Sequence, residues 1–345
     1  MNLKETIKSP PPMMGGIPRA PSVALRLELF RRLLRVRRVE EKIAELYPQK
    51  QMRCPVHLSI GQEAAAVGVC AALRPDDWAL SGHRSHGHYL AKGGDLKAML
   101  AELYGKATGC CRGKGGSMHF IDRRVGFMGA TPIVGSTIAI AVGAAFGSRV
   151  QKSKRVVAVF FGDAAVEEGV FHEAANFAVL KKLPVLFICE NNRYSVYSPL
   201  SVRQPPRRRI HRQAAAYGMK SLSGDGNDVL KTLALARKAV IHARSGKGPV
   251  FLELATYRWR EHCGPAYDND LGYRTVCEFE LWRKRCPVEA FTRVLTRSGE
   301  LQPARLAALE AEVATEVRAA VLFAQESPFP EPEALMSDIY AGESR

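Results

Sequence analysis

The sequence lacks the features that mark exported or membrane-spanning proteins. Its apolar run from Ile133 to Ser148 contains three glycines and falls short of the roughly 20 residues that cross a bilayer. The N-terminus has neither a basic start followed by an apolar stretch nor an Arg- and Ser-rich amphipathic stretch. We therefore expect no association with a membrane and a cytoplasmic location.

Cysteine pairs with the spacing of a zinc or dithiol site are missing as well. None of the eight cysteines forms a C-x-x-C pair, and a chain of 345 residues can bury a core without disulfides. We therefore expect free thiols at all of these positions, which are Cys54, Cys70, Cys110, Cys111, Cys189, Cys263, Cys277 and Cys286.

A nucleic-acid recognition motif is also absent, although the net charge of +16 would suit a protein that binds phosphates. Basic residues are densest between Arg31 and Arg38, within a helical pattern, and from Arg207 to Arg209 after two prolines. No aromatic residues alternate with these basic runs. A solvated face or a contact with a partner protein is therefore favoured over nucleic acid.

The chain divides into four segments by composition and periodicity. Residues 1–22 are rich in Pro and Gly, which predicts a flexible N-terminal arm. Helical spacing of apolar residues predicts an N-terminal helical segment over 23–55. Residues 56–275 alternate strand and helix patterns and form the predicted α/β domain, and 276–345 form a C-terminal helical segment.

The α/β domain is predicted to contain a mostly parallel sheet with helices on both faces. Val156–Phe161 and Pro184–Cys189 are continuous apolar runs typical of buried parallel strands, and Glu167–Lys181 between them has one apolar helical face. A right-handed crossover brings the carboxyl ends of the two strands to the same edge. A second round follows, with a strand at Met219–Leu222, a turn at Gly224–Gly226, a helix at Asp228–Arg244 and a strand at Val250–Thr256.

Polar residues suited to a metal-bound diphosphate follow the first two of these strands. Ligands of a parallel sheet bind beyond the carboxyl ends of its strands, which is where Gly162-Asp163 and Asn191-Asn192 fall. A hard divalent cation prefers oxygen ligands, and Asp163 and Asn192 supply a carboxylate and an amide oxygen. Their separation of 29 residues matches one strand-helix-strand unit, whose helix would direct its first amides at the phosphates.

Each half of this pair also has a simpler interpretation, because Asp often caps a helix and Asn often forms a turn. Gly224-Asp225-Gly226 provides a comparison within the same chain. The residue 29 positions after Asp225 is Leu254, in an apolar strand. The motif Gly224-Asp225-Gly226 therefore lacks a second metal ligand, whereas Gly162-Asp163 has one in Asn192.

The segment from Gly162-Asp163 to Asn192-Arg193-Tyr194 resembles the thiamine-diphosphate motif, which begins Gly-Asp-Gly and ends in Asn-Asn. The whole pattern resembles the α subunits of two-chain, thiamine-diphosphate-dependent 2-oxo acid dehydrogenases (E1) of the pyruvate, branched-chain and acetoin types. Three further segments agree with that family: His57-Leu58-Ser59-Ile60-Gly61-Gln62-Glu63-Ala64, His83-Arg84-Ser85-His86-Gly87 and Gly113-Lys114-Gly115-Gly116-Ser117-Met118-His119.

The resemblance implies roles for individual residues. Mg²⁺ would be bound by Asp163, by the Asn192 side chain and by the backbone carbonyl of Tyr194. His57 and His262 would face the substrate side and are the catalytic candidates, and His262 would assist transfer to a lipoyl group. The residues implied to bind the cofactor are His83, Arg84, Pro132, Val134, Gly162, Asp163, Ala164, Ala165, Asn192 and His262.

The sequence departs from the family pattern at three of these residues and at Cys263. Ala164 stands where Gly is usual, which is tolerable only if its φ is negative. His83 stands where many members have Tyr. Pro132 stands where pyruvate-type members commonly have Gly. In this it is similar to the branched-chain type. Cys263 follows the loop histidine where regulated mitochondrial members have a serine, so phosphorylation there is not expected.

The resemblance also implies a partner and a reaction. The glutamate that activates the cofactor belongs to a β subunit, so an α₂β₂ heterotetramer is expected, and the helix at Ile138–Phe146 suits either an interface or an ordinary core. The expected oxidoreductase reaction decarboxylates a 2-oxo acid, or cleaves a related compound such as acetoin. The acyl group would pass to a lipoyl-bearing acyltransferase (E2), with the loop Trp259–Tyr273 over the entrance. The alternative is a catalytically silent homologue with a regulatory or scaffold role.

Overall fold

The computed structural model describes residues 21–337, so the arm predicted over residues 1–22 lies almost entirely outside the described residues. Within 21–337, none of the helices is long and apolar enough to cross a membrane. All eight cysteines lie in this range and are free, as predicted.

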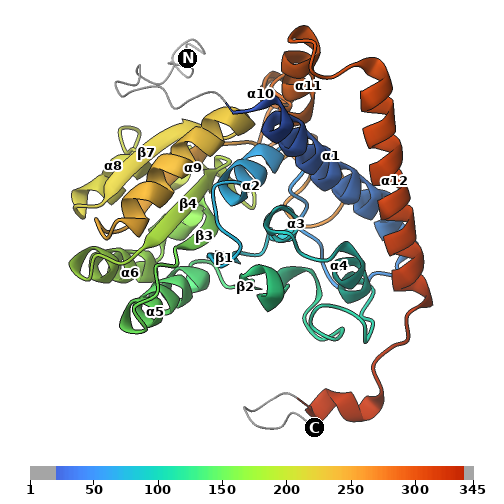
Figure 1. Cartoon of the computed structure of the whole chain (residues 1–345), viewed down its shortest axis with the longest axis horizontal. Helices are drawn as coiled ribbons and strands as arrows, with labels where there is room; N and C mark the ends of the chain where they lie inside the picture. The colour runs from blue at the N-terminus through green and yellow to red at the C-terminus, as the bar shows by residue number, and fades with distance from the viewer. Residues whose placement is uncertain (1–20, 338–345) are drawn as a thin grey trace.

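A six-stranded sheet forms the centre of the molecule (Figure 1). Its strand order is β2-β1-β3-β4-β8-β7, and every pair of neighbours is parallel. The parallel α/β sheet predicted from the sequence is therefore confirmed. The strands are β1 (Trp78–Ser81), β2 (Phe127–Ala130), β3 (Val157–Gly162), β4 (Val185–Asn191), β7 (Lys220–Asp225) and β8 (Val250–Ala255).

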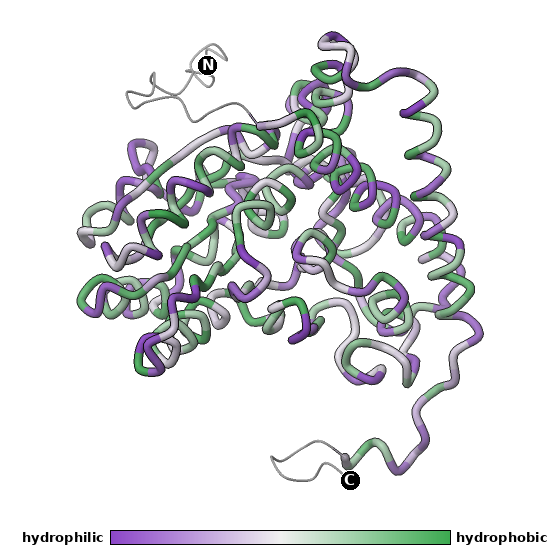
Figure 2. Tube along the Cα trace, in the orientation of Figure 1, coloured by the Kyte–Doolittle hydropathy of each residue, from purple (hydrophilic) through white to green (hydrophobic). Residues whose placement is uncertain are grey.

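Helices cover both faces of the sheet because the central strands are apolar on both sides. Along β3, Val157, Val159 and Phe161 belong to one buried cluster, whereas Ala158 and Phe160 belong to the other. Figure 2 shows the same strands as a hydrophobic centre. The first cluster includes α5 (Ser136–Val150), α6 (Gly169–Leu180) and α8 (Ile210–Ala216), and the second includes α2 (Glu63–Cys70), α3 (His86–Lys92) and α9 (Val229–Arg244).

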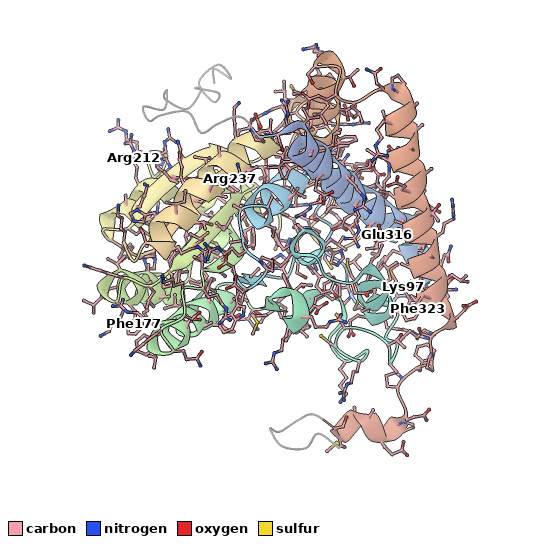
Figure 3. The ribbon with its side chains drawn as sticks, viewed as in Figure 1. Lys97, Phe177, Arg212, Arg237, Glu316 and Phe323 are labelled. Atoms are coloured by element: carbon pink, nitrogen blue, oxygen red, sulfur yellow. The ribbon has the colours of Figure 1, made fainter. Side chains whose placement is uncertain are left out.

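A further helical layer lies outside α2 and α3, where α1 (Val23–Leu46) packs against α11 (Pro287–Arg297) and α12 (Pro303–Glu326). Arg35 donates to Glu316 at 2.8 Å and Arg38 to Glu310 at 2.6 Å, and Figure 3 places Glu316 between α1 and α12. Part of the basic run of α1 is thus paired within the chain, through Arg35 and Arg38. Both α11 and α12 lie in the segment 276–345, which the sequence predicts to be helical.

Shorter elements connect these layers. They are α4 (Leu96–Leu103), α10 (Val276–Arg283), the hairpin of β5 (Tyr194–Ser195) and β6 (Ser198–Pro199), α7 (Leu200–Arg203), and the 3₁₀ turns Tyr47–Gln49, Gly116–Met118, Arg123–Val125, Asp163–Glu167 and Pro332–Met336.

Two predicted boundaries are wrong. Gly224 and Asp225 do not form a turn but extend β7, where they pair with Leu254 and Ala255. The Asp225 carboxylate can end a strand because Arg285 and the Asn227 amide satisfy it, both at 3.0 Å. The helix predicted to begin at Glu167 begins at Gly169, because a 3₁₀ turn and an extended Glu168 precede it.

Candidate active site

One cavity lies at the carboxyl edge of the sheet, where β1, β2, β3, β4 and β8 end. Gly162 pairs with Glu190 in the parallel register of β3 and β4, so Asp163 and Asn192 emerge from adjacent strands at the same level. The lining includes every residue that the sequence predicted for the site: His57, His83, Arg84, Pro132, Val134, Gly162, Asp163, Ala164, Ala165, Asn192, Tyr194 and His262.

Residues with oxygen atoms suited to a metal line part of this cavity, among them Asp163, Asn192 and Tyr194. The Asn192 amide nitrogen donates to Gln62 Oε1 at 3.2 Å, and its oxygen accepts from the Tyr194 backbone amide at 3.2 Å. These two bonds fix the orientation of the amide. Asp163 is buried, and burial raises the pKa of its carboxyl although the adjacent Arg203 charge opposes that shift. A carboxylate, an amide oxygen and a backbone carbonyl together suit Mg²⁺.

The segment after β3 leaves open space beside these oxygens. A Cβ atom on Gly162 would meet no other atom within 4 Å. Ala164 lies in the 3₁₀ turn Asp163–Glu167, and its φ is not positive. The Ala that replaces the usual Gly is therefore accommodated without backbone strain.

Arg84 brings a buried positive charge to the cavity without a carboxylate to neutralise it. Its two hydrogen bonds in the described structure go to backbone carbonyls, of Leu58 at 2.6 Å and of His262 at 3.1 Å. Burial, and then the charge of Arg258, lower its pKa to about 10. A buried cation held only by carbonyls is ready to pair with an anion such as a phosphate.

Gln62 is a site residue that the sequence analysis quoted without assigning a role. Its oxygen accepts from Asn192 at 3.2 Å and from Thr256 Oγ1 at 3.1 Å. Its amide nitrogen is buried in the cavity wall and has no partner among residues 21–337. A buried donor without a partner is costly, so this nitrogen also fits a bound acceptor.

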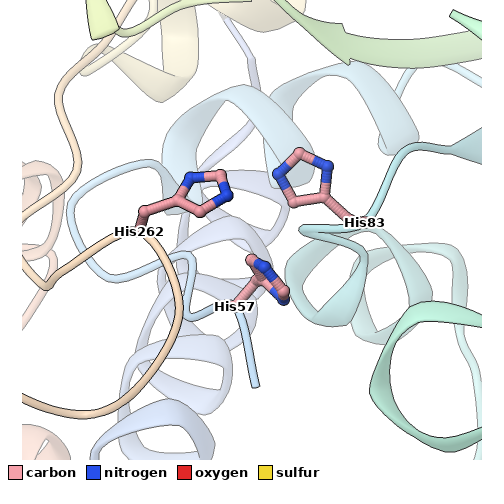
Figure 4. Close-up of side chains that lie close together, drawn as sticks. All are labelled: His57, His83 and His262. Carbon is pink, nitrogen blue, oxygen red and sulfur yellow. The ribbon is translucent and has the colours of Figure 1, made fainter. Parts of the chain in front are cut away.

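Three histidines meet on another wall of the cavity, as Figure 4 shows. The ring centroids of His57, His83 and His262 lie 4.8 to 5.3 Å apart. Burial, and then the Arg84 charge, lower the pKa of His57 to about 2 and that of His83 to about 3. The same two causes lower the pKa of His262 to about 4, so all three imidazoles are neutral at pH 7.

The three segments that carry the family motifs mostly support the wall of the cavity rather than line it. Glu40 accepts from Ser59 Oγ at 2.7 Å and contacts His86 Nδ1 at 3.1 Å, and His86 Nε2 contacts Ser117 Oγ at 2.7 Å. This buried chain ties the three segments that begin at His57, His83 and Gly113 to α1. Of the segment Gly113–His119, Met118 lines the cavity.

The loop after β8, which carries His262, is held by a buried cluster of charges. Asp268 accepts from Tyr273 Oη at 2.5 Å, contacts Arg258 at 3.3 Å and forms an ion pair with Arg274. Burial acts to raise the Asp268 pKa, but the Tyr273 hydrogen bond and the two arginines together lower it. These contacts give the loop a defined conformation in the wall of the cavity.

Sequence reasoning missed three other residues near the cavity. Arg203 on α7 pairs with both Asp163 and Glu167, the latter at 2.6 Å. Glu190, which lines the cavity, lies 3.0 Å from His88 Nε2. Glu190 stood beside the predicted Asn192 in the sequence, whereas no local signal pointed to Arg203 or His88.

A parallel sheet whose carboxyl edge gathers oxygen ligands, a buried arginine and neutral imidazoles defines a class of protein. This class consists of α/β enzymes that bind a cofactor at the carboxyl ends of their strands. Residues 31–333 match the family model described as dehydrogenase E1 component.

Curated relatives agree with this family over nearly the whole chain. The α subunit of acetoin:2,6-dichlorophenolindophenol oxidoreductase of Bacillus subtilis is 39% identical over 91% of this chain and 93% of the relative. The pyruvate dehydrogenase E1 α subunit of Rhizobium meliloti is 38% identical over 91% and 89%, and that of Zymomonas mobilis 37% over 92% and 88%. The chain belongs to the dehydrogenase E1 component family, as an α-type subunit.

This family consists of oxidoreductases, and membership implies thiamine diphosphate as the cofactor. The alternative of a catalytically silent homologue is not favoured, since the similar chains are subunits of active dehydrogenases. The resemblance stated from the motifs is thus confirmed at the level of the family.

Proposed function

We propose that this chain holds the diphosphate end of thiamine diphosphate through Mg²⁺ and forms a working E1 dehydrogenase with a β subunit. The observation that carries the proposal is the meeting of Asp163, Asn192 and Arg84 in one cavity, although they come from three different strands. The unpaired donor of Gln62 and the unpaired charge of Arg84 both favour a bound anion there.

In this proposal each residue has a physical task. Asp163, the Asn192 amide oxygen and the Tyr194 carbonyl bind Mg²⁺, while Gln62 holds the Asn192 amide in its ligating orientation. Arg203 pairs with Asp163 Oδ2, so the other carboxylate oxygen of Asp163 is available to the metal. Arg84 then neutralises phosphate charge that the metal leaves exposed.

The other residues of the cavity wall would contact the substrate and the end of the cofactor that reacts with it. Thiamine diphosphate, when bound, supplies the electron-accepting ring that decarboxylation of a 2-oxo acid requires. Pro132 and Val134 line the cavity and would contact that ring, and His57, His83 and His262 would offer neutral hydrogen-bonding groups to the substrate. His262 is our candidate for assisting transfer of the acyl group to a lipoyl carrier.

A β subunit is proposed to dock on the outer face of α5. Ile140, Phe146 and Val150 are exposed on that face, and Cβ atoms on Gly143 and Gly147 would meet nothing within 4 Å. The opposite face of α5 is buried against the sheet, so the helix has one covered and one open apolar side. The open side suits close packing of another chain, in an α₂β₂ assembly.

The substrate is proposed to be a 2-oxo acid or acetoin, in keeping with the names of the relatives. The test is turnover by the purified complex of this chain with its β subunit, using dye reduction as the readout. Pyruvate, branched-chain 2-oxo acids and acetoin are compared, each with and without thiamine diphosphate and Mg²⁺. Cofactor-dependent turnover of one of them is expected, and no turnover of any would contradict the proposal.

A further inference from the structure

The three histidines of the cavity come from three separate parts of the fold. His57 precedes α2, His83 follows β1, and His262 lies on the loop after β8. One ring nitrogen of each faces the space between the three rings (Figure 4), and these nitrogens lie within 4.8 Å of one another.

Their spacing is that of imidazoles around a metal ion. With metal–nitrogen distances of about 2.0 to 2.1 Å, the centroids of imidazoles around a tetrahedral ion lie roughly 5 Å apart. The observed centroid distances are 4.8 Å for His57–His83, 5.1 Å for His57–His262 and 5.3 Å for His83–His262. Small side-chain rotations would therefore bring three nitrogens to ligand distance.

The side chains of these histidines are also unsatisfied. Among residues 21–337, none of the three imidazoles has a hydrogen bond to a protein group. His57 is 6% exposed, and its Nδ1 is a buried atom with no partner. A buried polar atom in a protein is normally paired, so the unpaired Nδ1 of His57 favours a partner from outside the chain.

We propose that His57, His83 and His262 form a three-histidine site for a transition-metal dication of the Zn²⁺, Co²⁺ or Ni²⁺ class, with a fourth position open to the cavity. Imidazole nitrogens are the ligands that these ions prefer, whereas Mg²⁺ prefers the oxygens at the other end. The site is thus chemically distinct from the Mg²⁺ site at Asp163 and Asn192. A metal bound there would stand on the substrate side of the cavity and reduce turnover.

Charges around the cluster set its affinity. Arg84 and Arg258 act on these imidazoles as positive charges and oppose a dication, while Asp268 acts in its favour. An anionic fourth ligand, such as hydroxide or a substrate carboxylate, would offset the two arginines. We therefore expect moderate affinity that rises when such an anion is present.

The test is a Co²⁺ titration of the full-length chain, prepared without a polyhistidine tag and without thiamine diphosphate. One equivalent of Co²⁺ is expected to bind with the intense visible bands of a four-coordinate ion. His83→Tyr, which places the usual family residue at the position, should weaken binding at least tenfold and abolish those bands. His262→Gln should behave in the same way.

Matched controls separate this site from other candidates. Asp163→Ala and the exposed His119→Gln should leave the four-coordinate bands unchanged. Glu102, Cys110 and Cys111 form a second group of possible ligands, so Cys111→Ser is included and should also leave them unchanged. Thermal unfolding of each variant confirms that it is folded.

Two results would overturn the proposal. One is unchanged Co²⁺ affinity in folded His83→Tyr, and the other is loss of the bands in Cys111→Ser or Asp163→Ala. Inhibition gives a second readout in the complex with the β subunit: Zn²⁺ should inhibit the wild type more strongly than His83→Tyr. Equal inhibition of the two would also contradict the site.

Discussion

At the scale of single residues, the cavity is characterised by polar groups that the protein leaves without partners. Within residues 21–337, Arg84 is buried with only carbonyl partners, and Gln62 and His57 each keep a buried nitrogen unpaired. Such groups cost stability in the free protein, typically about 1 to 3 kcal/mol each. They are therefore expected to be retained for what they bind.

The histidine cluster predicts how stability depends on pH. The pKa values of His57, His83 and His262 in the folded chain, about 2, 3 and 4, lie below the ordinary value of 6.5. Between those values the unfolded chain binds more protons, so the free energy of unfolding should fall as the pH drops below about 6.5. Above pH 7 the three histidines should contribute no pH dependence.

Urea unfolding between pH 5 and 8 measures this effect. In His83→Tyr the loss of stability below pH 6.5 should be less steep than in the wild type, since one depressed histidine is gone. Identical slopes in the two proteins would show that the His83 imidazole is protonated as readily in the folded chain as in the unfolded one.

A second prediction at this scale concerns the effect of Gly61 on stability. Its φ is +96°, and a Cβ atom there would lie 2.5 Å from the Tyr257 carbonyl oxygen and from the Trp259 ring. Gly61→Ala should therefore destabilise the chain by about 1 to 3 kcal/mol or more. Gly143→Ala, in a helix with open space around it, is the control and should be neutral or stabilising by up to about 1 kcal/mol. Equal unfolding midpoints for the two variants would refute the steric argument.

At the scale of elements, charged clusters place the connections around the cavity. The loop after β8 is held by Arg258, Arg274 and Tyr273 around Asp268, and α7 is held by Arg203 against Asp163 and Glu167. The Asp268 cluster joins residues of the loop and its neighbours. The Arg203 cluster includes Asp163, a proposed metal ligand, so metal binding and the position of α7 should be linked.

Asp268→Asn tests the role of the loop cluster. Removing this carboxylate leaves two buried arginines without their partner, which should cost about 3 to 5 kcal/mol, part of it as local opening of the loop. Limited proteolysis should then cut between Trp259 and Tyr273, and turnover should fall because His262 loses its position. The exposed Asp270→Asn should leave both unchanged. Similar cleavage of the two variants would contradict the assigned role of Asp268.

The limits of sequence-based prediction also follow from particular elements. β3, β4 and β8 were predicted because buried parallel strands are continuous apolar runs, and Asp163 and Asn192 because they follow such runs. The 3₁₀ turn at Asp163 and the extension of β7 over Asp225 depend on Arg203 and Arg285, which are distant in sequence. Gln62 beside Asn192 depends in the same way on tertiary packing, for which a single sequence has no local signal.

At the scale of the whole molecule, one large apolar feature stays open on the surface. The outer face of α5 exposes Ile140, Phe146 and Val150, and the Phe146 ring lies 5.6 Å from that of Phe177 on α6, between ring centroids. Figure 3 labels Phe177 where α5 and α6 lie side by side. The basic α1, by contrast, is covered by α12. The assembly surface is thus expected on the α5 side.

Phe146→Glu should therefore weaken assembly with the β subunit while leaving the fold of this chain intact. The side chain is 40% exposed, so a charge there is tolerated in the free chain but not in an apolar interface. Analytical ultracentrifugation of the co-expressed chains should show dissociated species. Leu322→Glu on α12, at a position 53% exposed, is the control and should assemble normally. An intact complex in Phe146→Glu would place the interface elsewhere.

The central claim is that Asp163 and Asn192 hold the metal that anchors the cofactor. Calorimetric titration of thiamine diphosphate into the α/β complex, with and without Mg²⁺, tests it most directly. Binding should require Mg²⁺ in the wild type, and Asp163→Ala should abolish it, whereas Asp225→Ala, at the equivalent end of β7, should retain it. Unchanged Mg²⁺-dependent affinity in folded Asp163→Ala would contradict the assignment.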